Sequence, residues 1–375
     1  MEMKTADAPA KAAAKPAKAF GRFFLPGPTE VVAEVLEAQT RAMIGHRGAG
    51  IKALMEKLQV GLQDTFRTKK PVFLSTSSAT GLMEAAARNG VKQKALSLVN
   101  GAFSLRFAEI VESCGFEAER METQWGGVFD PQQLRDRLKK GGVDAVTVVH
   151  SETSTGALNP IGELAKVVRE FDDVVILVDS VTGVGGAEVQ TDGWDLDFIL
   201  TGSQKALALP PGLSFGVASE RMMERSKAAK NKGVYFDLVT FAKNQKDMMT
   251  PTTPALSVMY ALEVQLERIK KETMEARWAR HTAMLERCCA WVEGSGAGIS
   301  VLAPKGHRSP TVTAVKMPEG KPSAPVVTAM KEKGFVIGGG YGKIKDYTFR
   351  IGHMGDHTVA EQEAVLDALG EVLSK

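Results

Sequence analysis

Residues 201–206 read TGSQKA and follow the apolar run LDFIL at residues 196–200. These two segments decide the fold that we expect, because a short apolar run predicts a buried strand and Lys205 then stands at its exit. Burial removes water from an ammonium group and lowers its pKa, so a lysine in this place gains nucleophilic character. Most lysines are solvated surface charges, and the prediction of a reactive amine therefore depends on neighbouring segments.

Asp179 ends a second apolar run, VVILV at residues 174–178, and stands at the carboxyl end of another predicted strand. In an open parallel sheet, Lys205 and Asp179 would emerge at the same edge, where ligands of such folds bind. Pyridoxal phosphate needs this pair, because the lysine holds its aldehyde and the acid keeps its ring nitrogen protonated. Taken alone, an aspartate after a strand is also typical of a helix cap, a metal ligand or a ribose contact.

Three further loops lead to the same edge of the predicted sheet. Residues 75–81, STSSATG, precede a helix-like segment and predict a phosphate site, although the loop equally suits a cap of its own helix. Phe103 follows the predicted strand at 95–99, and its ring suits either a flat cofactor or the core. Ser154 follows the predicted strand at 145–149 as a cofactor contact or a turn residue. The convergence of these strand ends favours a cofactor site.

The same segments resemble the class V aminotransferases, most closely the alanine–glyoxylate and serine–pyruvate branch of that family. The resemblance spans roughly residues 20–375, in the family's order. The matching segments are LPGPT (25–29), MIGHR (43–47), ETSTG (152–156), VDSV (178–181), GSQKA (202–206), PPG (210–212) and FRIGH (349–353). This resemblance implies the α/β architecture of fold type I enzymes, with a mostly parallel seven-stranded sheet wrapped by helices and a smaller C-terminal α/β domain.

The resemblance also implies roles for single residues. Lys205 is similar to the Schiff-base lysine, and Asp179 is similar to the partner of the pyridine nitrogen. The other cofactor contacts that it implies are Ser78, Ala79, Thr80, Phe103, Ser154, Val181, Gln204 and Thr252. Two positions depart from the family pattern, because Phe103 stands where many relatives have tryptophan and Met249 where some have tyrosine.

Two of the implied roles concern the substrate and a second subunit. Arg350 resembles the family's substrate clamp, and a planar guanidinium suits a carboxylate because it donates two parallel hydrogen bonds. Thr252 is similar to the threonine that reaches the phosphate of the neighbouring subunit. The resemblance therefore implies a homodimer with shared active sites.

The implied function is that of a transaminase dependent on pyridoxal 5'-phosphate. It would move the amino group of alanine or serine to glyoxylate or pyruvate by a ping-pong mechanism. Alternatives in the same family are another donor, such as aspartate or ureidoglycine, or a lyase activity. A non-enzymatic binding protein on the same scaffold is a further alternative, but it would have no reason to keep Lys205, Asp179 and Arg350 together.

Other enzyme classes fit the sequence less well. A nicotinamide dehydrogenase would carry a Gly-x-Gly-x-x-Gly turn, and the glycine clusters at residues 183–186 and 338–342 lack that spacing. A cysteine desulfurase would have a histidine before the lysine and a reactive cysteine in a mobile loop. Here Gln204 precedes Lys205, and Cys288 lies in a helix-like stretch.

Composition limits the kinds of partner and the cellular compartment that we expect for this protein. No apolar run approaches the ~18 residues of a membrane span, and a formal charge of +3 is too small to favour nucleic acid. The cysteines, Cys114, Cys288 and Cys289, show no metal-ligand spacing, so we expect no metal site and no disulfide framework. A reducing cytoplasm is the expected location.

We expect three segments along the chain. Residues 1–19 are rich in alanine, lysine and proline and predict a disordered basic tail. Residues 20–254 alternate strand-like and helix-like segments and predict the large cofactor-binding domain. Residues 255–375 predict a long linking helical stretch followed by the small domain, whose last helix runs from about Val359 to Leu373.

Overall fold

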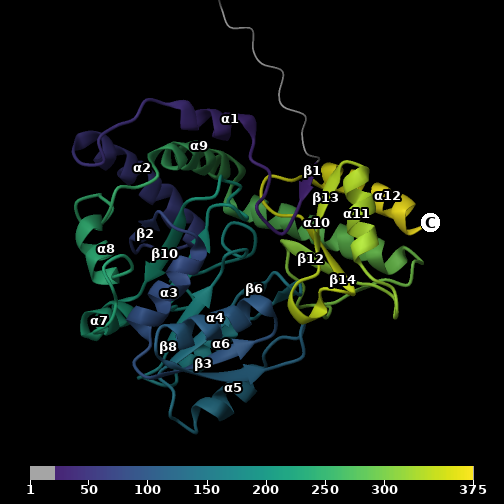
Figure 1. Ribbon diagram of the computed structural model, residues 1–375. Helices are drawn as coiled ribbons and strands as arrows, with labels where there is room; N and C mark the ends of the chain where they lie inside the picture. Colours follow the sequence, from purple (N-terminus) through teal and green to yellow (C-terminus); the bar gives the residue numbers. More distant parts are fainter. Residues whose placement is uncertain (1–21, 375) are drawn as a thin grey trace, which may run out of the picture.

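The computed structural model describes residues 22–374, and the predicted tail at residues 1–19 lies outside this range. The chain forms a large α/β domain and a smaller α/β domain at its side (Figure 1). Among the described residues, no helix has the length and apolar content needed to cross a membrane.

A seven-stranded sheet forms the centre of the large domain, in the order β2-β10-β9-β8-β5-β3-β4. Its strands are β2 (Val72–Ser75), β3 (Lys94–Val99), β4 (Glu117–Glu122), β5 (Ala145–Val149), β8 (Val175–Asp179), β9 (Phe198–Gly202) and β10 (Ser214–Ala218). Only β10 among these strands runs antiparallel to its neighbours, β2 and β9. The expected fold class, a mostly parallel sheet in an α/β protein, is confirmed.

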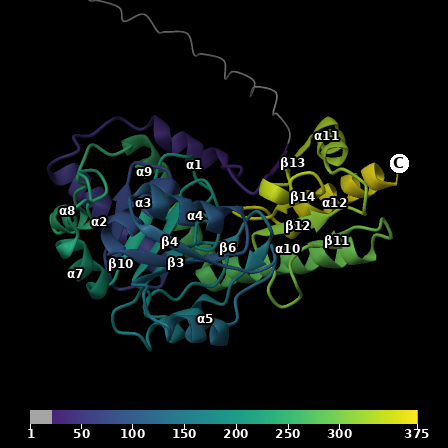
Figure 2. The ribbon, with the colours of Figure 1, turned by 60° about the horizontal axis from the view of Figure 1, so that its bottom comes forward.

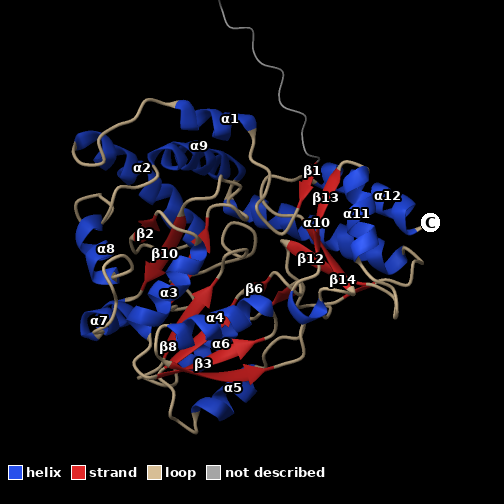
Figure 3. Ribbon diagram, viewed as in Figure 1, coloured by secondary structure: helices blue, strands red, loops and turns tan. Residues whose placement is uncertain are grey.

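Helices cover both faces of this sheet, which explains why its central strands are continuous apolar runs (Figure 3). In β8, Val175 and Leu177 enter one core and Ile176 and Val178 enter the other. The first core also contains side chains of α3 (Ala79–Gly90), α4 (Ala102–Ser113), α7 (Glu220–Ala228) and α8 (Leu238–Gln245). The second contains side chains of α2 (Ala49–Phe66), α5 (Pro131–Leu138), α6 (Ile161–Val168) and α9 (Leu256–Glu272). Figure 2 shows α4 and α5 on opposite sides of β3 and β4.

Two helices link the domains where the sequence predicts one long helical stretch. Helix α9 ends before Thr273, and α10 (Met274–Gly294) begins after it. Thr273 has a φ of +69°, which ends the first helix, and its hydroxyl accepts the Ala276 N–H to cap the second. The far end of α10 places Cys288 and Val292 in the small-domain core.

The small domain is built on a five-stranded sheet in the order β1-β13-β14-β12-β11. Its elements are β1 (Arg22–Phe24), β11 (Ser300–Val301), β12 (Val312–Lys316), β13 (Phe335–Gly339), β14 (Thr348–Gly352), α11 (Ala324–Glu332) and α12 (Val359–Leu373). Strand β1 pairs in parallel with β13, and Phe24 is fully buried with Ile337 and Phe349. The first described residues therefore belong to the small-domain sheet.

Candidate active site

A cavity opens at the carboxyl ends of β5, β8 and β9. The predicted site residues that line it are Ser78, Ala79, Thr80, Phe103, Asp179, Val181, Gln204 and Lys205. Side chains that the sequence analysis did not single out complete the lining: Met83, Arg106, Val149, Ser151 and Thr153. The structure thus brings most of the predicted cofactor contacts to one place.

Lys205 follows β9 in a tight loop, and its side chain is partly buried in this cavity. Burial, and then the nearby positive charge of Arg350, lower the pKa of Lys205 to about 8, while Asp179 acts in the opposite direction. The Lys205 Nζ donates a hydrogen bond to the Pro26 carbonyl oxygen. Gly27 has a φ of +100°, and a Cβ at this position would overlap the lysine side chain. The glycine leaves room for the amine.

The loop that carries Lys205 is held from behind by Arg277 of α10, which is 1% exposed. Its Nη2 donates to the Ala206 carbonyl (2.8 Å), and its Nε donates to the Gly185 carbonyl (3.0 Å). The same guanidinium pairs with Glu272 (2.8 Å) and with Asp356 (3.0 Å). These contacts join the linking helices to the loop after Asp179, the lysine loop and the loop after β14.

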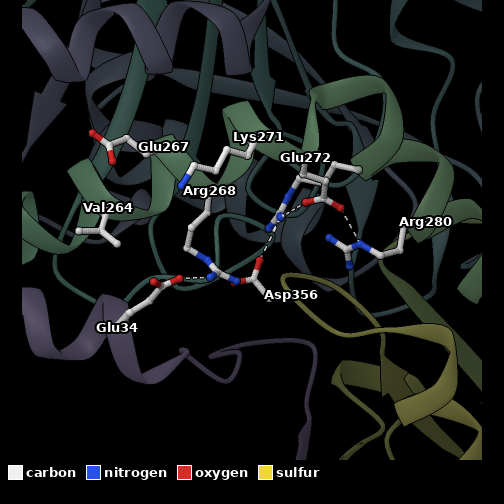
Figure 4. A pocket seen from close by; sticks show the side chains of 9 residues that line it. Glu34, Val264, Glu267, Arg268, Lys271, Glu272, Arg280 and Asp356 are labelled. Atoms are coloured by element: carbon white, nitrogen blue, oxygen red, sulfur yellow. Dashed lines mark hydrogen bonds and ion pairs between the residues drawn. The ribbon is translucent and has the colours of Figure 1, made fainter.

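A network of charges surrounds this arginine at a surface cavity (Figure 4). Arg280 pairs with Glu272, and Arg268 pairs with Glu34 and Asp356. Acidic and basic side chains alternate along this network, and the cavity lining as a whole holds as many acidic as basic side chains. We therefore assign this cavity a structural role.

Asp179 ends β8 and is 4% exposed. Its Oδ1 accepts the Val181 N–H at 2.9 Å, the one hydrogen bond that this carboxyl makes among residues 22–374. Burial raises the pKa of Asp179 to about 7, with Glu152 acting in the same direction and the Val181 N–H and Lys205 opposing it. A cationic N–H partner stabilises the ionised form of a carboxyl whose burial makes ionisation costly. Asp179 therefore fits the protonated nitrogen of a cofactor ring.

The N-terminus of α3 lies at another wall of the cavity. Ser78 is the N-cap residue, but its side chain makes no capping hydrogen bond. Ser78 and Thr80 are both exposed, and the N–H groups of Ala79 and Thr80 donate no hydrogen bond among residues 22–374. The alternative of a loop that merely caps its own helix is not favoured by this geometry. A phosphate fits here because free N–H groups and the helix dipole both attract an anion.

Glu152 is a buried residue whose importance the sequence analysis missed. Its carboxylate accepts the Ser104 N–H at 2.8 Å and the Ser154 hydroxyl at 2.6 Å. Ser154 in turn accepts the Ala102 N–H at 2.9 Å, so its hydroxyl supports the start of α4 and does not line the cavity. The expected contact between Ser154 and a cofactor stays a prediction. Nothing in the ETSTG segment distinguishes this buried glutamate from an exposed one.

Arg350 reaches the site from β14 of the small domain. Its Nε donates to the Gly339 carbonyl (2.8 Å) and its Nη1 to the Thr153 carbonyl (3.3 Å), so one side chain spans both domains. Its Nη2 has no hydrogen-bond partner in the part of the chain that the structure describes. Burial lowers the pKa of Arg350 to about 10, but the group stays cationic at neutral pH. Its Nη1 and Nη2 can therefore receive a carboxylate.

The match to known proteins covers most of the chain. Residues 28–343 match the family described as Aminotransferase class-V. The chain belongs to this family. An uncharacterized aminotransferase of Methanocaldococcus jannaschii is 40% identical over 88% of this chain and 87% of its own. The serine–glyoxylate aminotransferase of Arabidopsis thaliana is 30% identical over 89% of this chain and 85% of its own. The structure of an alanine–glyoxylate aminotransferase from Nostoc sp. has a TM-score of 0.90 at 28% identity, covering 99% of this chain and 100% of that one.

Class V aminotransferases are pyridoxal 5'-phosphate enzymes, and this chain is accordingly a transferase that depends on that cofactor. The residues present fit the group. Lys205 would hold its aldehyde, Asp179 its ring nitrogen, and the N-terminus of α3 its phosphate, with Phe103 and Val181 at the ring. When bound, the cofactor supplies an electron sink for negative charge that develops at the substrate α-carbon.

Arg350→Lys is expected to raise the KM for amino acids and 2-oxo acids by about 30-fold, since losing a bidentate pair costs roughly 2 kcal/mol. A lysine ammonium cannot reproduce the contacts to Gly339 and Thr153 and still present two donors to a carboxylate. Steady-state kinetics with both substrate classes measures the effect. Arg287→Lys is the control, because Arg287 of α10 forms a partly exposed ion pair with Glu363 of α12. Unchanged KM values in the Arg350 variant would place the clamp elsewhere.

Proposed function

We propose that this enzyme transfers the amino group of alanine or serine to glyoxylate or pyruvate by a ping-pong mechanism. The observation that carries the proposal is that Lys205 and Asp179 line one cavity and that Arg350 lies close enough to lower the pKa of Lys205. The Nη2 of Arg350 has no partner among residues 22–374 and is free to bind a substrate carboxylate. The Arabidopsis and Nostoc relatives, which are named for serine and alanine as donors and for glyoxylate, support the choice of substrates.

Different side chains of the site bind the substrate, transfer its proton and exclude water. Arg350 holds the α-carboxylate and so fixes the direction of the bond between the α-carbon and its hydrogen. The Nζ of Lys205 has a lowered pKa and is partly neutral near pH 8, so it can accept the α-proton and later return one. Val149 and Met83 are buried apolar residues of the cavity lining, and they limit the access of water to the site of proton transfer.

A panel of amino donors tests the proposal. The holoenzyme is mixed with alanine, serine, aspartate or other amino acids without an acceptor, and the conversion of the bound cofactor is followed by absorbance. We expect alanine or serine to react fastest and glyoxylate or pyruvate to restore the starting spectrum. Initial rates at several fixed acceptor concentrations should give parallel double-reciprocal lines. A preference for aspartate, or elimination products instead of a 2-oxo acid, would overturn the proposed substrates.

We also propose that the working unit is a homodimer with shared sites, located in the cytoplasm. Thr252 is exposed in the loop between α8 and α9, and its hydroxyl has no partner in the described part of this chain. An exposed threonine with a free hydroxyl is suited to reach the phosphate of a second subunit. The cysteines are free thiols, which fits a reducing compartment.

Thr252→Val is expected to weaken cofactor retention several-fold, because the valine removes the hydroxyl that would bind the partner's phosphate. Equilibrium dialysis of the two proteins against a series of cofactor concentrations measures the change. Thr253→Val is the matched control, since Thr253 is the exposed neighbour in the same loop. Bound cofactor should also stabilise the dimer in sedimentation experiments, because a ligand that touches both chains favours the assembled form. A fully active monomer would contradict the shared site.

A further inference from the structure

Tyr341 lies where the two domains meet and has no assigned role in the proposed reaction. It lies in the loop between β13 and the short helix η2 (Gly342–Ile344) of the small domain. Its ring stacks on Phe103 of α4, with 5.5 Å between ring centroids and 7° between ring planes. The Arg350 Cζ lies 5.6 Å from the centroid of the same ring. One tyrosine thus contacts both a cavity-lining ring and the substrate clamp.

Arg106 fixes the other end of this tyrosine. Its Nη2 donates to the Tyr341 hydroxyl at 2.8 Å, and its Cζ lies 5.0 Å from the centroid of the Phe103 ring. Arg106 also lines the cavity one turn along α4 from Phe103. The tyrosine hydroxyl and ring face are therefore both held by large-domain side chains, although the residue belongs to the small domain.

The neighbouring backbone keeps Tyr341 at this junction. Gly342 has a φ of +64°, and a Cβ at this position would lie 2.6 Å from the Trp125 ring. The Lys343 Nζ lies 4.6 Å from the centroid of that ring. The loop is consequently packed against the large domain at three successive residues, which holds the tyrosine against Phe103 and Arg350.

We propose that Tyr341 is a positioning residue that sets the affinity of this enzyme for the carboxylates of its substrates. The Arg350 guanidinium is held at its edge by Gly339 and Thr153 and is approached by the Tyr341 ring. These contacts restrict the orientation of the guanidinium and leave its Nη2 without a partner among residues 22–374. Because the same ring stacks on Phe103, it also fixes the clamp relative to the cofactor face. This inference rests on the assignment of Arg350 as the clamp in the proposed function.

The test compares two tyrosines of the small domain. Tyr341→Leu is expected to raise the KM of the amino donor and of the 2-oxo acceptor by about tenfold, with kcat within about twofold of the parent. Tyr341→Phe keeps the ring and should stay within about threefold in both KM values. Tyr347→Leu is the matched control, because Tyr347 and Tyr341 are both 39% exposed but Tyr347 makes no ring contact among the described residues.

A binding measurement separates this inference from the proposed function. Propionate carries the carboxylate but no amino or keto group, and its Kd is obtained by titrating the absorbance and circular dichroism of the bound cofactor. We expect about tenfold weaker propionate binding in Tyr341→Leu and parental binding in Tyr347→Leu. This result decides the role of Tyr341 even when alanine and serine prove not to be donors. Tyr341→Met is held to the same criteria if the leucine variant does not fold.

Three results would overturn the inference. The first is parental KM and Kd values in Tyr341→Leu. The second is a fall in kcat with unchanged KM, which would assign the tyrosine to the chemical step or to the stability of the domain. The third is an equal rise in KM in Tyr347→Leu, which would show a general effect of the small domain.

Discussion

Lys205→Ala is expected to lower the rate of transamination by roughly 10⁴-fold or more, because one side chain both holds the cofactor and moves the substrate proton. Treatment of the parent holoenzyme with borohydride, followed by peptide mapping, should find the cofactor on the peptide that contains Lys205. The alanine variant should carry no trapped cofactor.

Lys227→Ala is the control for this experiment, since Lys227 is an exposed lysine of α7 paired with Glu224. It should retain both the trapped cofactor and the activity of the parent. Cofactor trapped on a different lysine in the parent would remove Lys205 from its central role.

Asp179→Asn is expected to reduce turnover by roughly 10²-fold to 10⁴-fold while the fold persists. The amide has the shape of the carboxyl but no negative charge, so it cannot keep a ring nitrogen protonated. Folding should tolerate the change, because ionising this carboxyl in its buried place is already costly, as its pKa of about 7 indicates. Turnover and thermal unfolding of the holoenzyme measure the two effects.

Asp173→Asn is the matched control for Asp179. Asp173 lies just before the opposite end of β8, and its side chain is 81% exposed and paired with Lys92. An asparagine there should leave turnover unchanged. Parental turnover in Asp179→Asn would exclude this carboxyl from the site.

The sequence predicted which residues meet at the carboxyl edge of the large sheet, because parallel sheets leave strong local signals. A strand buried on both sides is a continuous apolar run, and a polar residue at its carboxyl end stands at the ligand-binding edge. Asp179 and Lys205 follow this rule, and both line the cavity. The helix at Val359–Leu373 was also predictable from the sequence, since Thr358 and Glu361 form a capping box at its start.

The remaining features depend on contacts between distant segments. In the sequence, Glu152 cannot be distinguished from an ordinary polar loop residue, because its burial depends on contact with α4. Arg277 has the sequence context of a surface residue on an amphipathic helix, and its burial depends on the distant loop that carries Lys205. Tyr341 carries no local signal, because its partners come from another domain. Thr273 was missed because its break of the helix depends on a positive φ that a threonine rarely adopts.

The pairing of β1 with β13 has a consequence for the order of events on the ribosome. Residues 22–24 are made early, but the strand against which they pack, Phe335–Gly339, is made near the end of synthesis. The small-domain sheet cannot be completed until nearly the whole polypeptide has been released, whereas the large-domain sheet needs nothing beyond β10. The large-domain sheet of the nascent chain should therefore fold first, and β14 with Arg350 should join the site last. A translation product truncated before β14 would lack the proposed substrate clamp even where its large-domain sheet is complete.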